Sequence, residues 1–191
     1  TTEGVAGLVP VPVINPALAN WRDELAASAA DPRVRAVRLL PRYHNYRLNA
    51  PALQEFTAEL LRRRLRLIVQ VRLIDERHEF HAMNLKPVPV AELGAFLTRH
   101  PKLSVLASGL LRSEILPLVT RHPQLLADLS FAEWHDTMPH LLAKVPARQL
   151  VFASHTPFLV TAAARAKLDT AKLGGIRQPA IAAGNLARFL G

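Results

Sequence analysis

The sequence has no cysteine among its 191 residues. Disulfide bonds, thiolate metal sites and a cysteine nucleophile are therefore excluded for this chain. The absence of thiols does not indicate a compartment, because it is compatible with both oxidising and reducing surroundings. Hydrophobic residues make up 50% of the chain and charged residues 20%. This composition and length predict one packed globular domain over residues 1–191.

Long hydrophobic runs are missing as well. No apolar stretch is long enough to span a bilayer, and no cleavable secretory signal is visible. We therefore expect no membrane partner and a cytoplasmic location. The first residue is Thr rather than Met, which is compatible with further residues upstream.

Several sequence motifs are also absent. No glycine-rich loop follows a strand-like run, so a dinucleotide-binding fold has no support, and no Gly-x-Ser-x-Gly predicts a serine nucleophile elbow. The net charge is +9, from 24 Lys and Arg against 15 Asp and Glu, yet no RNP-like, helix-turn-helix or zinc-finger pattern accompanies it. The cations are spread over predicted helices and turns. We expect no nucleic-acid partner; the alternative would appear as steeply salt-dependent binding.

Strand-like runs alternate with helical segments along the chain. Apolar, β-rich runs occur at Val5–Val13, Val34–Leu40, Arg66–Leu73, Leu103–Ala107, Leu125–Ser130 and Gln149–Ala153. Their starts lie 22 to 37 residues apart, which is the period of strand–loop–helix–loop units. Helices are expected at 16–30, 52–64, 90–99, 115–121, 137–144, 157–168 and 178–190. The alternation favours a parallel sheet, and at this level a doubly wound sheet and an eightfold barrel both fit.

Two near-repeats mark helix ends. The sequence Thr-Arg-His-Pro occurs at 98–101 and again at 120–123, each time before a strand-like run. Proline cannot continue a helix, so both runs predict αβ loops, which lie on the bottom face of an α/β barrel. His100 and His122 are therefore predicted to be residues at helix C-termini rather than metal ligands.

Five stretches carry a resemblance to the amidohydrolase-related family, which includes many metal-dependent hydrolases and decarboxylases. They are VRAVRLLPRYHNYRLNAP (34–51), RLRLIVQVRL (64–73), HPKLSVLASG (100–109), ARQLVFASHTPF (147–158) and the closing IAAGNLARFLG (181–191). They resemble the family's strands four, five, six and eight and its last helix. The resemblance implies an α/β fold, a TIM-barrel-like (β/α)8 domain with six βα units, strands three to eight, and without strands one and two.

The family's metal ligands do not carry over. The resemblance places the histidine of strand five at Gln70, that of strand six at Ser108, and the water-activating aspartate of strand eight at His155. Strand one, which normally carries a His-x-His pair, is not in this chain. Catalytic zinc needs about three His or carboxylate ligands, so we expect no metal site here; zinc becomes an option only if a missing N-terminal segment supplies ligands.

The resemblance implies a hydrolase of a small molecule whose usual ligands are absent or replaced. The alternative is a non-catalytic barrel that binds a small, anionic ligand. The mouth of such a barrel lies at the C-terminal strand ends. His155 is the expected catalytic residue there, as a general base at the end of strand eight. An equally weighted alternative is a hydrogen-bonded histidine at a strand end.

Five further residues are expected to contact the substrate: Tyr43, His44, Gln70, Arg72 and Ser108. Gln70 and Arg72 alternate along one strand, so their side chains share a face. They either point into the mouth or form a buried polar layer with Arg72 paired to Asp75 or another carboxylate. Tyr43 and His44 follow a strand and belong to a loop at the mouth, or to a packed loop whose tyrosine hydroxyls bond the backbone.

The six units predict an open edge. Six strands cannot close an eight-stranded barrel, and exposed strand edges invite pairing. We expect the chain to be a fragment of a longer protein whose N-terminal segment covers this edge, to form a homo-oligomer, or to rearrange. The histidines at 78, 81 and 135 are expected in solvated loops, without a third metal ligand nearby.

Overall fold

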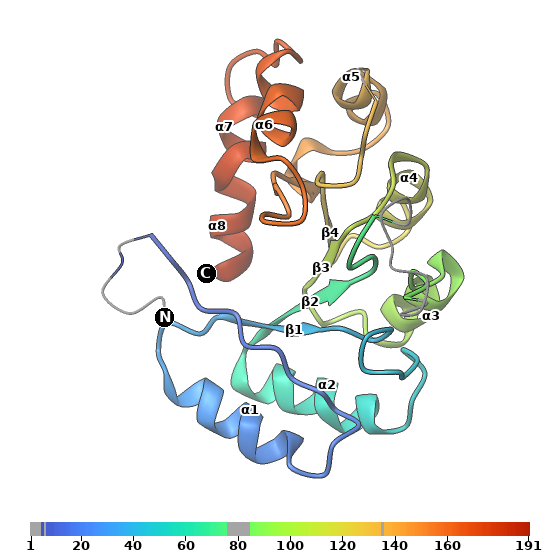
Figure 1. Ribbon diagram of the computed structural model, residues 1–191, viewed down its shortest axis with the longest axis vertical. Helices are drawn as coiled ribbons and strands as arrows, with labels where there is room; N and C mark the ends of the chain where they lie inside the picture. The colour runs from blue at the N-terminus through green and yellow to red at the C-terminus, as the bar shows by residue number, and fades with distance from the viewer. Residues whose placement is uncertain (1–4, 6, 76–84, 135) are drawn as a thin grey trace.

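A computed structural model describes residues 5, 7–75, 85–134 and 136–191 (Figure 1). One parallel sheet of five strands, in the order β1-β2-β3-β4-β5, lies at its centre. The strands are β1 (Ala36–Leu39), β2 (Arg66–Gln70), β3 (Val105–Ser108), β4 (Leu125–Asp128) and β5 (Leu150–Val151). Strands that are consecutive in sequence are neighbours in the sheet, as repeated βα units require. The α/β class and five of the expected strands are confirmed.

Helical segments connect the strands. They are α1 (Trp21–Ala30), α2 (Ala52–Arg63), α3 (Val90–Arg99), α4 (Arg112–Val119), α5 (Thr137–Leu142), α6 (Thr161–Asp169), α7 (Arg177–Pro179) and α8 (Asn185–Leu190), with the 3-10 turn η2 (Ala147–Gln149) and the π-helical turn η3 (Ala180–Gly184). Figure 1 shows α2 to α5 along the outer side of the curved sheet and α8 on the opposite side. Every expected helix overlaps an observed one.

The outer face of the sheet forms the main core. Alternate strand residues, among them Val37, Leu67, Val69 and Val105, are fully buried and pack against the helices in one large apolar cluster. The strands read as continuous apolar runs because helices cover one face and α8 covers part of the other. This layer holds the strand ends in register.

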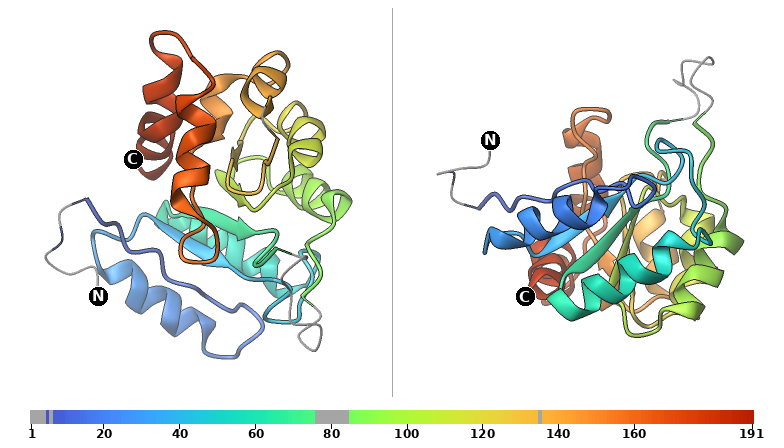
Figure 2. Two further views of the ribbon diagram at one scale, coloured as in Figure 1. Left: turned by 45° about the horizontal axis from the view of Figure 1, so that its top comes forward. Right: turned by 90° about the horizontal axis from the view of Figure 1, so that it is seen from below.

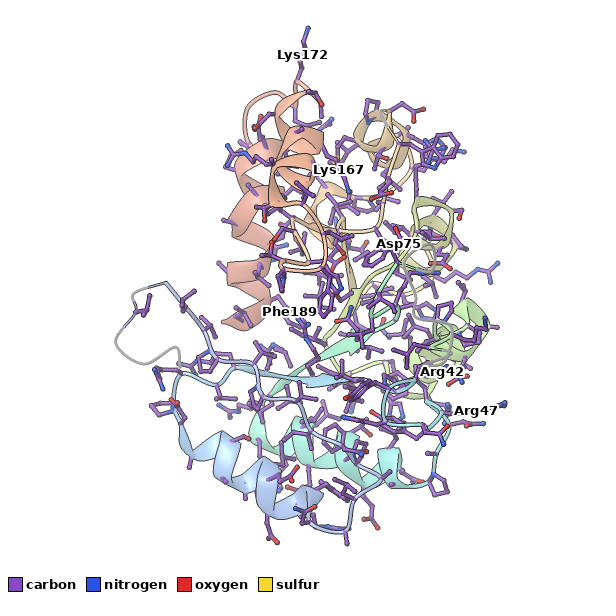
Figure 3. All side chains as sticks on the ribbon, viewed as in Figure 1. Arg42, Arg47, Asp75, Lys167, Lys172 and Phe189 are labelled. Atoms are coloured by element: carbon purple, nitrogen blue, oxygen red, sulfur yellow. The ribbon has the colours of Figure 1, made fainter. Side chains whose placement is uncertain are left out.

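The inner face carries a smaller apolar layer at the N-terminal ends of the strands. Ala36, Ile68, Leu106 and Val151 pack there against Phe189 of α8, which Figure 3 labels at the lower end of that helix. The Arg66 side chain donates a hydrogen bond from Nε to the Phe189 carbonyl at 3.0 Å. The last helix therefore spans the concave side of the sheet from β5 to β2.

In the first expected strand, 5–13, the described residues form a single bridge. Val13 pairs in parallel with Arg38 of β1, through an Arg38 N–H bond to Pro12 O at 2.8 Å and an Ile14 N–H bond to Arg38 O at 3.1 Å. Pro10 and Pro12 have no N–H to donate, so the segment cannot extend the ladder. Figure 2 shows it running beside β1 before the chain enters α1.

Helix boundaries differ from the expectation where side chains or turns intervene. α4 begins earlier than expected, at Arg112, because the Glu114 carboxylate accepts the Leu111 N–H at 2.8 Å and satisfies the helix start. The closing helix is interrupted by the π-helical turn η3. His100 is the C-terminal capping residue of α3, and His122 follows α4, as predicted. The histidines at 78, 81 and 135 lie outside the described residues.

Within the described ranges, no helix combines the length and the apolar character needed to cross a bilayer.

Candidate functional site

A polar row lies on the inner face, one level above the apolar layer and toward the C-terminal strand ends. It contains Gln70 of β2, Ser108 of β3 and Asp128 of β4. Arg38 of β1 lies one inward position lower, in register with Ile68, and its side chain reaches the row through a hydrogen bond to Gln70. Gln70 and Ser108 are direct partners in the sheet, and Ala107 pairs with Ala127, so Asp128 continues the same level. Parallel strands in register thus bring together three side chains that lie far apart in sequence, and Arg38 joins them from β1 through Gln70.

The Gln70 amide links two strands. Its Oε1 accepts a hydrogen bond from Arg38 Nη1 at 3.0 Å, and its Nε2 donates to the Arg72 carbonyl at 2.7 Å. Gln70 is only 3% exposed. Because both ends of the amide are used, its orientation is fixed, and it holds the Arg38 guanidinium with a neutral partner.

Asp128 is a buried carboxylate with one oxygen heavily used. Its Oδ1 accepts hydrogen bonds from the Gly109 N–H, the Ser130 N–H and the Ser130 hydroxyl, at 3.2, 3.2 and 2.7 Å. These donors fix the orientation of the carboxylate. Asp128 in turn raises the pKa of Arg38, although burial is the larger effect and lowers that pKa.

Arg38 is a half-buried cation without a close carboxylate. Among the ion pairs of the described residues none involves Arg38, and its side chain donates a hydrogen bond to the neutral amide of Gln70. Its charge is therefore balanced only through space, by Asp128. A desolvated guanidinium with one neutral partner retains N–H donors that can bind an anionic ligand.

His155 lies in the loop after β5, with a left-handed backbone at φ 53°. Its Nε2 lies 2.6 Å from the Leu73 carbonyl oxygen. A carbonyl only accepts, so Nε2 carries a proton, and Nδ1 is the atom that can gain or release one. The ring packs between Phe131 and Phe158, with centroid distances of 5.1 and 5.5 Å.

Arg38, Ser108, Asp128 and His155 line one cavity of about 570 Å³. Its walls are apolar and come from several parts of the chain: Gly7, Val9, Val11, Ile68, Leu73, Leu106, Val151, Phe152, Ala153, Phe158, Leu186 and Leu190; Ser154 and Thr156 complete the lining. The cavity thus lies between the inner face of the sheet, the N-terminal segment, α8 and the loop after β5. It combines a polar floor with apolar walls, as small-molecule sites do.

A second hollow of about 600 Å³ adjoins the loops after β2, β3 and β4. Arg72 borders it, 5% exposed at its side chain, and donates to the Gly109 carbonyl at 2.7 Å while pairing with Glu114 at 3.2 Å. Arg112 lies 4.9 Å from the Trp134 ring centre on the same rim. Arg72 thus faces a carboxylate in a buried polar layer.

The structure separates the residues singled out from the sequence. Ser108 and His155 line the inner cavity, and Gln70 supports it through Arg38. Tyr43 and His44 lie in the loop between β1 and α2 and are not among the lining residues of that cavity. Tyr43 is 56% exposed, and burial lowers the pKa of His44.

Arg38 and Asp128 are the site residues that the sequence analysis missed. The resemblance assigned ligand positions to Gln70, Ser108 and His155 and drew no attention to Arg38 of β1 or to Asp128 of β4. The signal was present: Arg38 interrupts an apolar run at the spacing of inward residues, and Asp128 ends another. A charged side chain inside a buried strand needs a partner of opposite charge, and Arg38 and Asp128 are such partners for one another.

No protein-family model matches the sequence, and no curated protein matches it. Solved structures do match. A TIM-barrel protein from Bordetella bronchiseptica has a TM-score of 0.71 at 17% identity, and 5-carboxyvanillate decarboxylase LigW from Sphingomonas paucimobilis has 0.72 at 15%; each match covers 95% of this chain and 66% of the other. 2,6-Dihydroxybenzoate decarboxylase from Rhizobium has 0.70 at 12%, covering 95% and 70%.

These similarities concern the fold. The chain spans about two thirds of the barrels that it matches, so the expectation of a partial TIM barrel is confirmed. A further match, dihydroxybenzoic acid decarboxylase from Polaromonas with bound manganese and an inhibitor, has a TM-score of 0.56 at 12% identity, over 76% of this chain and 55% of that one. The named neighbours are decarboxylases rather than the hydrolases that we expected. Within the described residues, no three His, Asp or Glu side chains gather to hold a metal.

Proposed function

We propose, from the amidohydrolase-related TIM-barrel fold that this chain has in part, that its inner cavity binds a small organic carboxylate and that His155 transfers a proton to or from it. The observation that carries the proposal is Arg38, a desolvated guanidinium at the cavity whose side chain is bonded to neutral Gln70. Such a cation is stabilised by an anion, such as a carboxylate, that accepts two hydrogen bonds and donates none.

The cavity favours a carboxylate attached to an apolar body. Ile68, Leu106 and Phe158 are among its walls, and its volume of about 570 Å³ falls within the range usual for small-molecule sites. A benzoate-sized acid would place its ring against these walls and its carboxylate toward Arg38. The decarboxylases of similar fold act on aromatic acids by name, which supports an aromatic acid as the first ligand class to test.

Decarboxylation fits the available groups better than the hydrolysis we first expected. In that reaction the bond between the carboxylate carbon and its neighbour breaks, carbon dioxide leaves, and the electron pair stays on the neighbouring carbon. That carbon then takes a proton, which Nδ1 of protonated His155 can give while Nε2 stays bonded to Leu73.

The remaining predicted residues take supporting roles in this proposal. Ser108 offers a hydroxyl to the ligand from the cavity floor, and Gln70 orients Arg38. We assign no ligand contact to Tyr43, His44 and Arg72 in this proposal, because none of the three lines this cavity. The whole domain, 1–191, is taken as one unit in this proposal.

Isothermal titration with benzoate, 2,6-dihydroxybenzoate and resorcinol tests the binding. We expect the two acids to bind and resorcinol, which lacks the carboxylate, to bind at least about tenfold more weakly. Arg38→Gln should remove the preference for the acids. Arg47→Gln is the matched control, because Arg47 is exposed and extends away from the sheet (Figure 3). Equal affinity for benzoate and resorcinol in the unchanged protein contradicts the proposal.

Carbon dioxide release from 2,6-dihydroxybenzoate tests the chemistry separately. We expect His155→Gln to abolish release while leaving acid binding within about threefold, because glutamine retains a donor for the Leu73 carbonyl. Acid binding without release in the unchanged protein would favour the non-catalytic anion-binding barrel that the sequence left open. Release that persists in His155→Gln would remove His155 from the reaction.

A further inference from the structure

Barrels of this fold can hold a divalent cation, as the manganese-bound neighbour illustrates. The inner cavity of this chain offers such an ion few ligands. Of the lining residues that the structure describes, only Asp128 and His155 have a carboxylate or an imidazole. Zinc takes about four ligands of these kinds, and manganese and magnesium favour six, mostly oxygens.

Both of these side chains are already committed in part. Asp128 accepts three hydrogen bonds through Oδ1, which leaves Oδ2 as its available atom. His155 donates through Nε2 to the Leu73 carbonyl, so only Nδ1 has a lone pair to offer. Two donor atoms do not make a tight site for a divalent cation, and Ser108 adds only a neutral hydroxyl.

A fixed positive charge is already present in the same cavity. The Arg38 guanidinium stays protonated at any working pH and is held in place by Gln70. Asp128, the only carboxylate among the described lining residues, interacts with it electrostatically. A divalent ion placed beside Asp128 would therefore face repulsion from Arg38, and it would compete for the carboxylate that balances Arg38.

We propose that the Arg38 guanidinium takes the electrostatic role of a divalent cation in this cavity, so that a ligand carboxylate is bound by a protein side chain and without metal. The ligand in this inference is the one of the proposed function, so that part rests on the proposed carboxylate site. The exclusion of metal is argued from Arg38, Asp128 and His155 alone. The arrangement also explains a charge that is otherwise costly: a desolvated arginine persists because Asp128 stabilises it before the ligand arrives and the ligand stabilises it afterwards.

Manganese titration followed by electron paramagnetic resonance tests the exclusion directly. We expect no Mn²⁺ binding below about millimolar by the unchanged protein, and binding at least about tenfold tighter in Arg38→Gln, because removing the guanidinium leaves the negative Asp128 uncompensated. Arg38→Gln combined with Asp128→Asn should lose that gain. Stoichiometric, micromolar Mn²⁺ in the unchanged protein, or no difference between it and Arg38→Gln, overturns the proposal.

Benzoate titration with and without EDTA tests the ligand side. We expect the affinity to be unchanged by EDTA, reduced about 10- to 100-fold in Arg38→Gln, and intermediate in Arg38→Lys, which keeps the charge but not the forked donors. A loss of benzoate affinity in EDTA overturns the inference. If benzoate binds to none of these proteins while the manganese results hold, the proposed function fails and the exclusion of metal remains.

Discussion

Among the glycines of the described residues, Gly109 is the one at which an added methyl group should lower the free energy of unfolding most. Its φ is +86°, and a Cβ added there would lie 2.6 Å from the Arg72 carbonyl oxygen and 3.1 Å from the Arg72 nitrogen. Left-handed backbone costs a non-glycine residue about 1 kcal/mol, and forcing apart packed backbone adds about 2 to 3 kcal/mol. Gly109→Ala should therefore lower the free energy of unfolding by about 3 to 4 kcal/mol.

Thermal unfolding followed by circular dichroism measures the effect. For a chain of this length 1 kcal/mol corresponds to about 2 to 4 °C, so Tm should fall by roughly 10 °C. Gly175→Ala is the control for backbone strain alone, because its φ is +56° and no atom lies within 4 Å of an added Cβ. It should cost about 1 kcal/mol. Equal losses in the two variants would refute the close approach of Gly109 to Arg72.

Three smaller effects follow from other positions. Gly94→Ala should raise the free energy of unfolding by about 0.5 to 1 kcal/mol, measured by urea titration. Gly94 lies inside α3, and an added Cβ would meet only ordinary contacts at 3.7 and 3.8 Å. A lower free energy of unfolding would show that the methyl group does not fit. Gln149→Leu should cost about 2 kcal/mol, because the two Nε2 protons are shared among three carbonyl oxygens, with exposed Gln54→Leu near zero as the control. Burial lowers the pKa of His100 below its usual 6.5. Under acidic conditions the folded protein therefore binds fewer protons than the unfolded chain, and stability is lost as the pH falls below about 6.5. His100→Gln should reduce the difference in unfolding free energy between pH 7.5 and 5.5, and an unchanged difference would contradict that assignment.

The strand and helix pattern predicted most of the fold because each βα unit carries local signals. Apolar strand runs, the Thr-Arg-His-Pro helix ends and the closing helix all depend on residues close in sequence, and they appear where they were expected. The segment 5–13 is the exception. Its β-rich composition predicted a strand, but the missing N–H groups of Pro10 and Pro12 limit it to one bridge.

The site was harder to predict because it depends on register. The family resemblance directed attention to His155 and Ser108, which both line the inner cavity. Arg38 and Asp128 were missed, since only the alignment of neighbouring strands shows that both charges face one cavity. A shift of one residue along a strand would turn Arg38 to the opposite face. Sequence spacing alone does not fix that alignment.

The hydrogen bond from Arg66 to the Phe189 carbonyl joins residues 123 positions apart. During synthesis the sheet can begin to form early, but its concave side stays open until the last helix leaves the ribosome. Contacts of such long sequence separation slow folding, because the loop between them must be ordered first. The cavity, walled by Leu186 and Leu190 of that same helix, is therefore completed last. A kinetic probe placed on α8 should report a later event than one placed on β2.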